Sequence, residues 1–108
     1  AMALVPLHAK VKFERDVKPI LETHCVRCHG SDAAMKGLRL DRKDRAMRAI
    51  VAKKPEDSRV YLASKVGFMP PGPKKLSAEE LETLRKWIAE GAKWPKKVEL
   101  AGRNPWLP

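Results

Sequence analysis

The chain has 108 residues, which is enough for one small domain and too few for two. Its formal net charge is +10, from 23 Lys and Arg against 13 Asp and Glu, which points to an acidic protein partner, a nucleic acid or an anionic membrane surface. No run of about 18 apolar residues exists, so no membrane span is expected. No signal-peptide pattern opens the chain, so an exported protein would be met here in its mature form.

The N-terminal part is predicted to hold an arm and one helix. Residues 1–12 mix apolar and basic residues and are expected to form a flexible arm. Asp16 is the expected N-cap of a helix that runs to about Cys25, with Pro19 in its first turn, where a missing N–H breaks no helical hydrogen bond. The apolar positions that share one face of this helix are Val17, Ile20 and Leu21.

Two short helices are predicted in the middle of the chain. The first is capped by Asp41 and is ended by Pro55. The second begins at Asp57 or Ser58 and ends near Lys65. The apolar stripe of the first helix consists of Met47, Ile50 and Val51.

The clearest helix follows a stiff loop. Residues 68–76 contain three prolines in nine positions, which excludes a helix or a central strand. Ser77 and Glu80 then form a capping box, and Gly91 supplies the stop. The apolar face between them consists of Leu81, Leu84, Trp87 and Ile88. No apolar–polar alternation is long enough for a sheet, so the expected fold class is all-α.

The strongest chemical signal is the pentapeptide Cys25-Val26-Arg27-Cys28-His29. C-x-x-C-H attaches c-type haem: the two thiols add to the haem vinyl groups as thioethers, and the adjacent histidine can reach the iron. A thioredoxin-like dithiol is a weaker alternative because no βαβ pattern surrounds the pair, and a structural zinc site lacks a second Cys/His pair. We therefore expect one covalent haem c on Cys25 and Cys28, with His29 as the proximal iron ligand.

The distal position of such an iron can be filled by methionine, by histidine or by nothing. The candidates in this chain are Met35, Met47, Met69, His8 and His24. Met69 is favoured because it lies 40 residues after His29 in the proline-rich loop, which can hold a thioether with little loss of entropy. An ordinary methionine packed under a loop is the alternative. His24 is expected to be a surface residue that points away from the iron.

These features resemble the Planctomycete-type cytochrome c domain, within the class I cytochromes c. The stretches that carry the resemblance are residues 13–21, 25–30, 37–41, 69–71 and 87–95. It implies a small helical fold around one covalent haem, with His29 and Met69 as axial ligands, in the periplasm or elsewhere outside the cytoplasm. We accordingly expect a cytochrome c domain over 13–95 and a tail over 96–108. The segment between Asp41 and Ser58 departs from the family pattern, because it is basic and helix-like rather than glycine-rich.

The remaining pocket is expected to be an apolar shell around the haem. Its predicted members are Leu38, Leu40, Phe68, Pro70, Leu84, Trp87 and Trp94. Burying the ring in such a shell raises the reduction potential, as does a methionine ligand. Trp87 is expected to pack rather than to take part in redox chemistry. The indole N–H of Trp94 has two equal interpretations, a contact with a haem propionate or a packed lid.

A basic segment spans residues 36–54. Its cations are Lys36, Arg39, Arg42, Lys43, Arg45, Arg48, Lys53 and Lys54. A solvated face is the simplest interpretation. The functional interpretation is a docking surface for an acidic redox protein, since complementary charge speeds encounter. No aromatic interleaving supports binding of nucleic acid.

The favoured function is that of a monohaem c-type cytochrome, a monomer that transfers single electrons and is not itself an enzyme. One alternative is a haem domain that binds or senses a small gas or a peroxide, although no second histidine or arginine is placed as a distal catalytic group. Another is a haem-stapled module of a larger extracytoplasmic protein.

Overall fold

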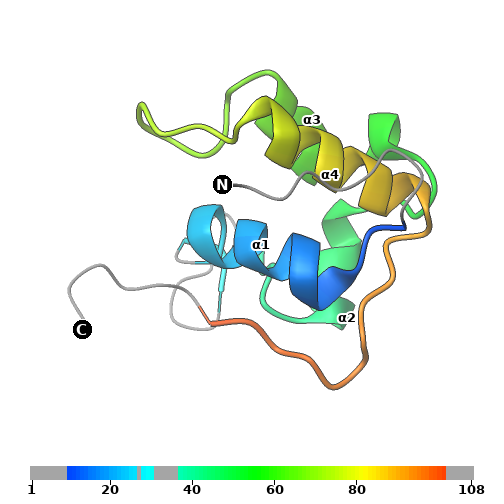
Figure 1. Ribbon diagram of the computed structural model, residues 1–108. Helices are drawn as coiled ribbons and strands as arrows, with labels where there is room; N and C mark the ends of the chain where they lie inside the picture. Colours follow the sequence, from blue (N-terminus) through cyan, green and yellow to red (C-terminus); the bar gives the residue numbers. More distant parts are fainter. Residues whose placement is uncertain (1–9, 27, 31–36, 102–108) are drawn as a thin grey trace.

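The computed structural model describes residues 10–26, 28–30 and 37–101 (Figure 1). Four α-helices and three short helical turns form this part of the chain, which contains no strand, so the predicted all-α class is confirmed. None of these helices has the length and apolar character needed to cross a bilayer. The candidate ligands His8 and Met35 lie outside the described residues.

The first helical segment begins before Asp16. A π-helical turn, η1 (Phe13–Val17), leads directly into α1 (Lys18–His24). Asp16 is therefore inside the segment rather than its N-cap, and its carboxylate accepts a hydrogen bond from the backbone N–H of Lys12 at 2.8 Å. The apolar face predicted for the helix extends back into the π-helical turn, because the first residue of that turn is buried.

The middle of the chain forms shorter elements than predicted. α2 (Lys43–Ala46) continues into a 3-10 turn, η3 (Met47–Ala49), and a second 3-10 turn, η4 (Pro55–Asp57), precedes α3 (Arg59–Lys65). The helical segment thus ends well before the proline that was expected to stop it. The predicted apolar stripe is only partly confirmed, because Val51 follows the turn and is 43% exposed.

Two predicted cap residues use their side chains elsewhere. Asp41 is buried and accepts two hydrogen bonds from the guanidinium of Arg39, at 3.0 and 2.7 Å. Ser58 does occupy the N-cap position of α3, but its hydroxyl accepts from the N–H of Val51 at 2.8 Å and donates to the carbonyl of Lys54 at 2.9 Å. Both side chains therefore tie the loops around α2 and α3 rather than a helix end.

α4 (Ala78–Ala89) begins as predicted. The Ser77 hydroxyl accepts from the N–H of Glu80 at 3.0 Å, and the Glu80 carboxylate accepts from the N–H of Ser77 at 2.9 Å. Gly91 follows the helix with φ of 112°, a backbone conformation that favours glycine. The buried residues of the helix are Leu84, Trp87 and Ile88.

The hydrophobic core packs the first helical turn, η1, against the last helix, α4, and the segment that follows it. α4 packs against η1 and lies beside α3, with α1 and α2 on the other side of the core (Figure 1). The Phe13 ring lies 5.7 Å from Trp87 and 4.4 Å from Trp94, between ring centroids. Aromatic pairs at these distances stabilise the core beyond what the burial of their apolar surface contributes.

Packing extends beyond the boundaries predicted for the domain. The N–H of Val11 donates to the Glu90 carboxylate at 2.9 Å, so the described end of the arm is attached to the segment after α4. At the other end, Leu100 is buried and its N–H donates to the carbonyl of Asp41 at 2.7 Å. Val98 and Leu100, from the predicted tail, therefore pack with the core of the domain.

Candidate functional site: a cavity at the C-x-x-C-H motif

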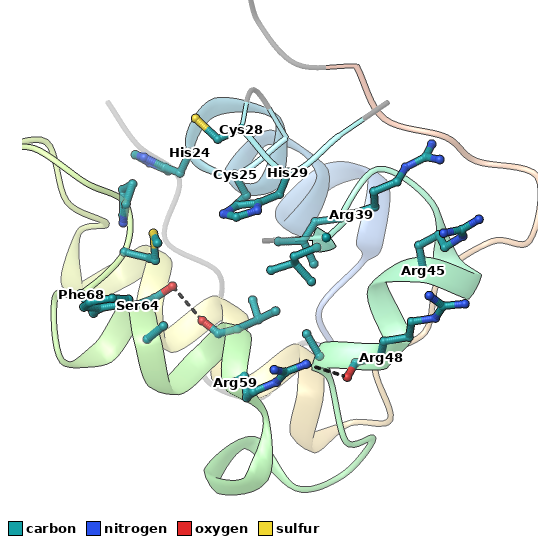
Figure 2. A pocket seen from close by; sticks show the side chains of 18 of the residues that line it. His24, Cys25, Cys28, His29, Arg39, Arg45, Arg48, Arg59, Ser64 and Phe68 are labelled. Carbon is teal, nitrogen blue, oxygen red and sulfur yellow. Dashed lines mark hydrogen bonds between the residues drawn. The ribbon is translucent and has the colours of Figure 1, made fainter. Parts of the chain in front are cut away.

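A cavity of about 320 Å³ lies between the end of α1, the α2–η3 segment, α3 and the proline-rich loop (Figure 2). This volume is within the range of sites that bind small molecules and cofactors. The apolar residues of its lining are Leu38, Leu40, Ala49, Val60, Ala63, Phe68, Met69, Pro70 and Pro71. Much of the wall therefore suits a flat, apolar group.

The whole reactive part of the C-x-x-C-H motif faces this cavity. Cys25, Cys28 and His29 all line it. The backbone N–H of Cys25 bonds to the carbonyl of Leu21 at 2.9 Å, so the end of α1 carries the first thiol directly to the wall. The carbonyl of His29 accepts from the N–H of Leu40 at 2.6 Å, which holds the motif against the next segment of the lining.

Gly30, which follows the motif directly, is required by the packing of the motif. A Cβ atom at this position would clash with the carbonyl oxygen of Val26 and would lie 2.8 Å from its Cγ1. Backbone would have to move to relieve the first contact, and that backbone carries both cysteines. A glycine directly after the motif is the sequence signal for this close approach.

The surroundings of the two thiols separate the possible chemistries of the pair. Burial raises the pKa of the Cys25 thiol to about 12, with smaller contributions from the charges of Glu80 and Cys28. Disulfide exchange needs a thiolate, and the raised pKa of Cys25 disfavours that form. The described residues also contain no group of three or more His, Cys, Asp or Glu side chains that could hold a metal ion. A neutral thioether suits this wall better than a redox dithiol or a zinc site.

The residues present fit a covalently attached haem. The Nδ1 atom of His29 is buried and has no hydrogen-bond partner among the described residues. Buried polar atoms normally have a partner, so an imidazole left without one beside two cysteines is suited to ligate a metal. The apolar lining provides the remaining contacts that a porphyrin ring needs.

Met69 lines the same cavity as His29. Its N–H donates to the carbonyl of Ala63 at 3.1 Å, and the ammonium group of Lys75 donates to the carbonyl of Pro70. The loop is thus tied to α3 and to its own far end. Met47, the other methionine among the described candidates, packs against the hydrophobic core and is not part of the lining.

Four of the predicted pocket residues line the cavity, namely Leu38, Leu40, Phe68 and Pro70. Phe68 is 72% exposed, so it forms part of the rim rather than the floor. Leu40 is buried. The apolar shell is therefore built mainly from the segment after the motif and from the proline-rich loop.

The other three predicted pocket residues, Leu84, Trp87 and Trp94, lie in the hydrophobic core and not in the lining. The indole N–H of Trp87 donates to the carbonyl of Lys93, and that of Trp94 to the carbonyl of Val98, both at 2.8 Å. The donor of Trp94 is thus already used within the fold, and Trp94 is a core residue. The prediction is corrected because α4 turns its apolar face toward η1 and not toward the cavity.

His24 is also placed differently from the sequence-based expectation. Its side chain is only 6% exposed and lines the cavity. Its Nε2 lies 3.1 Å from Oε2 of Glu80, at the start of α4. The expectation of a surface residue is wrong because the last turn of α1 faces another helix rather than solvent.

One wall of the cavity was missed from the sequence. Val60, Ala63 and Ser64 of α3 line it, and their i, i+3, i+4 spacing is the signal that could have revealed this face. Four arginines also line the cavity, namely Arg39, Arg45, Arg48 and Arg59. The guanidinium of Arg39 pairs with Asp41 and lowers the pKa of that carboxyl, chiefly through the hydrogen bonds between them.

Comparison with known proteins agrees with this site. Residues 25–72 match the model of the family described as Planctomycete cytochrome C. The matched stretch contains the C-x-x-C-H motif, the described lining that follows it and the loop of Met69. No curated protein and no solved structure matched the chain. The family match covers residues 25–72, and the helical fold and the cysteine-lined cavity agree with a cytochrome c family domain of the Planctomycete type.

Proposed function

We propose that this domain is a monohaem c-type cytochrome that transfers single electrons outside the cytoplasm. The observation that carries the proposal is that Cys25, Cys28, His29 and Met69 line one largely apolar cavity. A bound haem supplies an iron that gains or loses one electron at a time.

Different residues of the cavity would bind different parts of the haem. Each thiol of Cys25 and Cys28 adds its sulfur and hydrogen across one vinyl group, so two thioethers form and no atom is lost. His29, whose buried Nδ1 has no hydrogen-bond partner among the described residues, is the proximal ligand in this proposal. Met69 is the distal ligand, and its position in the same lining and its tethered loop support that role.

The apolar lining has a further effect on the iron. It keeps water away from the ring and disfavours the extra positive charge of the ferric state, which raises the reduction potential. With a ligand on each face, the iron has no position left for a substrate. These features favour an electron carrier over an enzyme.

Covalent attachment is tested by producing the chain in a host that exports it and attaches c-type haem. We expect one haem per chain, retained after denaturing electrophoresis, with the spectrum of the alkaline pyridine adduct typical of two thioethers. The double variant Cys25→Ala/Cys28→Ala should lose this retained haem. Extraction of the haem from the native chain by acidified acetone would show that no thioether exists and would refute the proposal.

A further inference from the structure

Some cations of the basic segment line the cavity. Arg39, Arg45 and Arg48 from this segment, together with Arg59 of α3, line the cavity. Figure 2 shows Arg45, Arg48 and Arg59 on the sides of the view away from Cys28. A set of guanidinium groups around an otherwise apolar cavity calls for a ligand that is apolar at its centre and anionic at its edge.

The four arginines differ in whether their charge is already balanced. Arg39 is bound through two nitrogens to the buried carboxylate of Asp41. Arg45, Arg48 and Arg59 make no ion pair with any carboxylate of the described residues. Among the described residues, the side chains of this trio make one hydrogen bond, from Arg59 Nη2 to the backbone carbonyl of Arg48 at 3.3 Å. No Asp or Glu lines the cavity in the described part of the chain, so the lining itself supplies no anion to balance these charges.

Haem has the matching distribution of charge. Its two vinyl groups lie on one edge of the porphyrin, and its two propionates lie on the opposite edge. Thioethers at Cys25 and Cys28 would fix the vinyl edge at the end of α1. The propionate edge would then face away from the cysteines, which is where the unpaired arginines lie.

We propose, on the basis of the function proposed above, that Arg45 and Arg48 bind the haem propionates and that Arg59 adds a third positive charge beside them. A guanidinium presents parallel N–H donors that match a carboxylate, and such charge-assisted pairs are among the stronger hydrogen bonds. The basic segment is thereby divided by function. Its cavity-facing arginines serve the cofactor, and its exposed lysines remain available for a partner.

The proposal has a consequence for the reduction potential. Positive charge close to the ring disfavours the ferric state and therefore raises the potential. Paired arginines also keep both propionates ionised across the neutral range, because an opposite charge stabilises the ionised form. The potential should then change little with pH in the wild-type domain.

The test compares two charge-matched double variants of the holo-domain. Arg45→Gln/Arg48→Gln removes the proposed propionate ligands, and Lys43→Gln/Lys54→Gln removes the same charge from exposed lysines of the same segment that do not line the cavity. The midpoint potential is measured from pH 5 to pH 9. Arg45→Lys/Arg48→Lys, which keeps the charge on a side chain that is readily accommodated, is the third protein.

We expect the midpoint potential of the Arg45→Gln/Arg48→Gln variant at pH 7 to fall clearly below that of the Lys43→Gln/Lys54→Gln control. Its potential should also rise as the pH is lowered, because the unpaired propionates then take up protons in the neutral range. The Arg45→Lys/Arg48→Lys variant should recover most of the lost potential. His24 and His29 line the same cavity and are present in all the proteins, so they do not distinguish the variants.

The proposal for the arginines would be overturned if Arg45→Gln/Arg48→Gln and Lys43→Gln/Lys54→Gln had equal midpoint potentials and equal pH profiles. The pyridine spectrum of each protein distinguishes this failure from that of the function. Absence of covalent haem from the wild type would refute both proposals, whereas attached haem with an unmoved potential would refute only the second.

Discussion

Met69 and Met47 have the same side chain in different surroundings, and this makes them a matched pair. Met69 lines the cavity, whereas Met47 packs against the core. Met69→Ala should lower the midpoint potential, remove the weak long-wavelength ferric band of iron–sulfur ligation and allow carbon monoxide to bind the ferrous iron, because thioether sulfur prefers ferrous iron. Visible spectra and a redox titration measure these changes.

Met47→Ala is the control for a loss of packing. It should leave the spectrum unchanged and lower the free energy of unfolding by about 2 kcal/mol, because its side chain is only partly buried. An unaltered ferric spectrum and potential in Met69→Ala would assign the distal ligand elsewhere. Ready binding of carbon monoxide by the wild type would favour a small-ligand site instead of an electron carrier.

Asp41 gives the stability of the domain a specific dependence on pH. Its carboxyl is buried, and the pairing with Arg39 holds its pKa below the ordinary value of 3.8. A carboxyl with a lowered pKa in the folded state stabilises the fold above its ordinary pKa, and this stabilisation is lost as the pH falls through the lowered value. Stability should therefore decline below about pH 4.

The variant Asp41→Asn should be less stable by about 2 kcal/mol at pH 7 and should lose less stability on acidification than the wild type. Asp44→Asn is the control, because Asp44 is also paired with an arginine but its side chain is 61% exposed. Denaturant unfolding at pH 3 and pH 7 measures both effects. This assignment would be contradicted if acidification lowered the free energy of unfolding of Asp41→Asn and of the wild type by the same amount.

Among the secondary-structure elements, α4 gives the most direct test of how much local side-chain capping stabilises a helix. The reciprocal hydrogen bonds between Ser77 and Glu80 satisfy backbone groups that the first turn would otherwise leave unpaired. Ser77→Ala should therefore lower the free energy of unfolding by about 1 kcal/mol. Ser77→Asp, which restores an acceptor at the same position, should recover most of the loss. An alanine variant as stable as the wild type would show that the cap contributes nothing here.

Features that depend on neighbouring residues along the chain could be predicted from the sequence. The capping box, the glycine after α4 and the C-x-x-C-H motif all belong to this class. Side chains whose partners lie on other segments could not be assigned in the same way. Asp41 was expected to cap a helix and is instead bound by Arg39, while His24 was expected at the surface and is instead buried against Glu80.

The position of the apolar face of α4 relative to the cavity belongs to the same class. Periodicity correctly grouped Leu84 and Trp87 on one face, and both are buried. It does not specify which neighbour covers that face, and here the neighbour is η1 rather than a cofactor site. Only the packing of the whole chain decides between the two.

At the scale of the whole molecule, the net charge of +10 governs encounter with other charged species. We expect an acidic redox protein to be the natural partner. With ferricyanide as an anionic probe, the rate of oxidation of the ferrous domain should fall steeply as ionic strength rises, because exposed charges are screened within about 10 Å at 0.1 M salt. A cationic cobalt complex should show the opposite trend, and stopped-flow spectroscopy measures both.

Two charge-reversal variants locate the contribution of the basic segment to this effect. Lys43→Glu/Lys54→Glu alters exposed lysines of the segment, and Lys96→Glu/Lys97→Glu alters exposed lysines near the other end of the described chain. The first pair should slow oxidation by ferricyanide more than the second. Equal slowing would mean that overall charge, and not a surface at this segment, determines the rate.

The carboxylate of Glu80 divides its two oxygens between two helices. Oε1 accepts from the N–H of Ser77 at the start of α4, and Oε2 lies against His24 in the last turn of α1, next to the first cysteine. Fraying of either helix end removes a partner from the other, so the two ends should open as one cooperative unit. Haem attachment at Cys25 should therefore slow amide hydrogen exchange in the first turn of α4 as well as in α1.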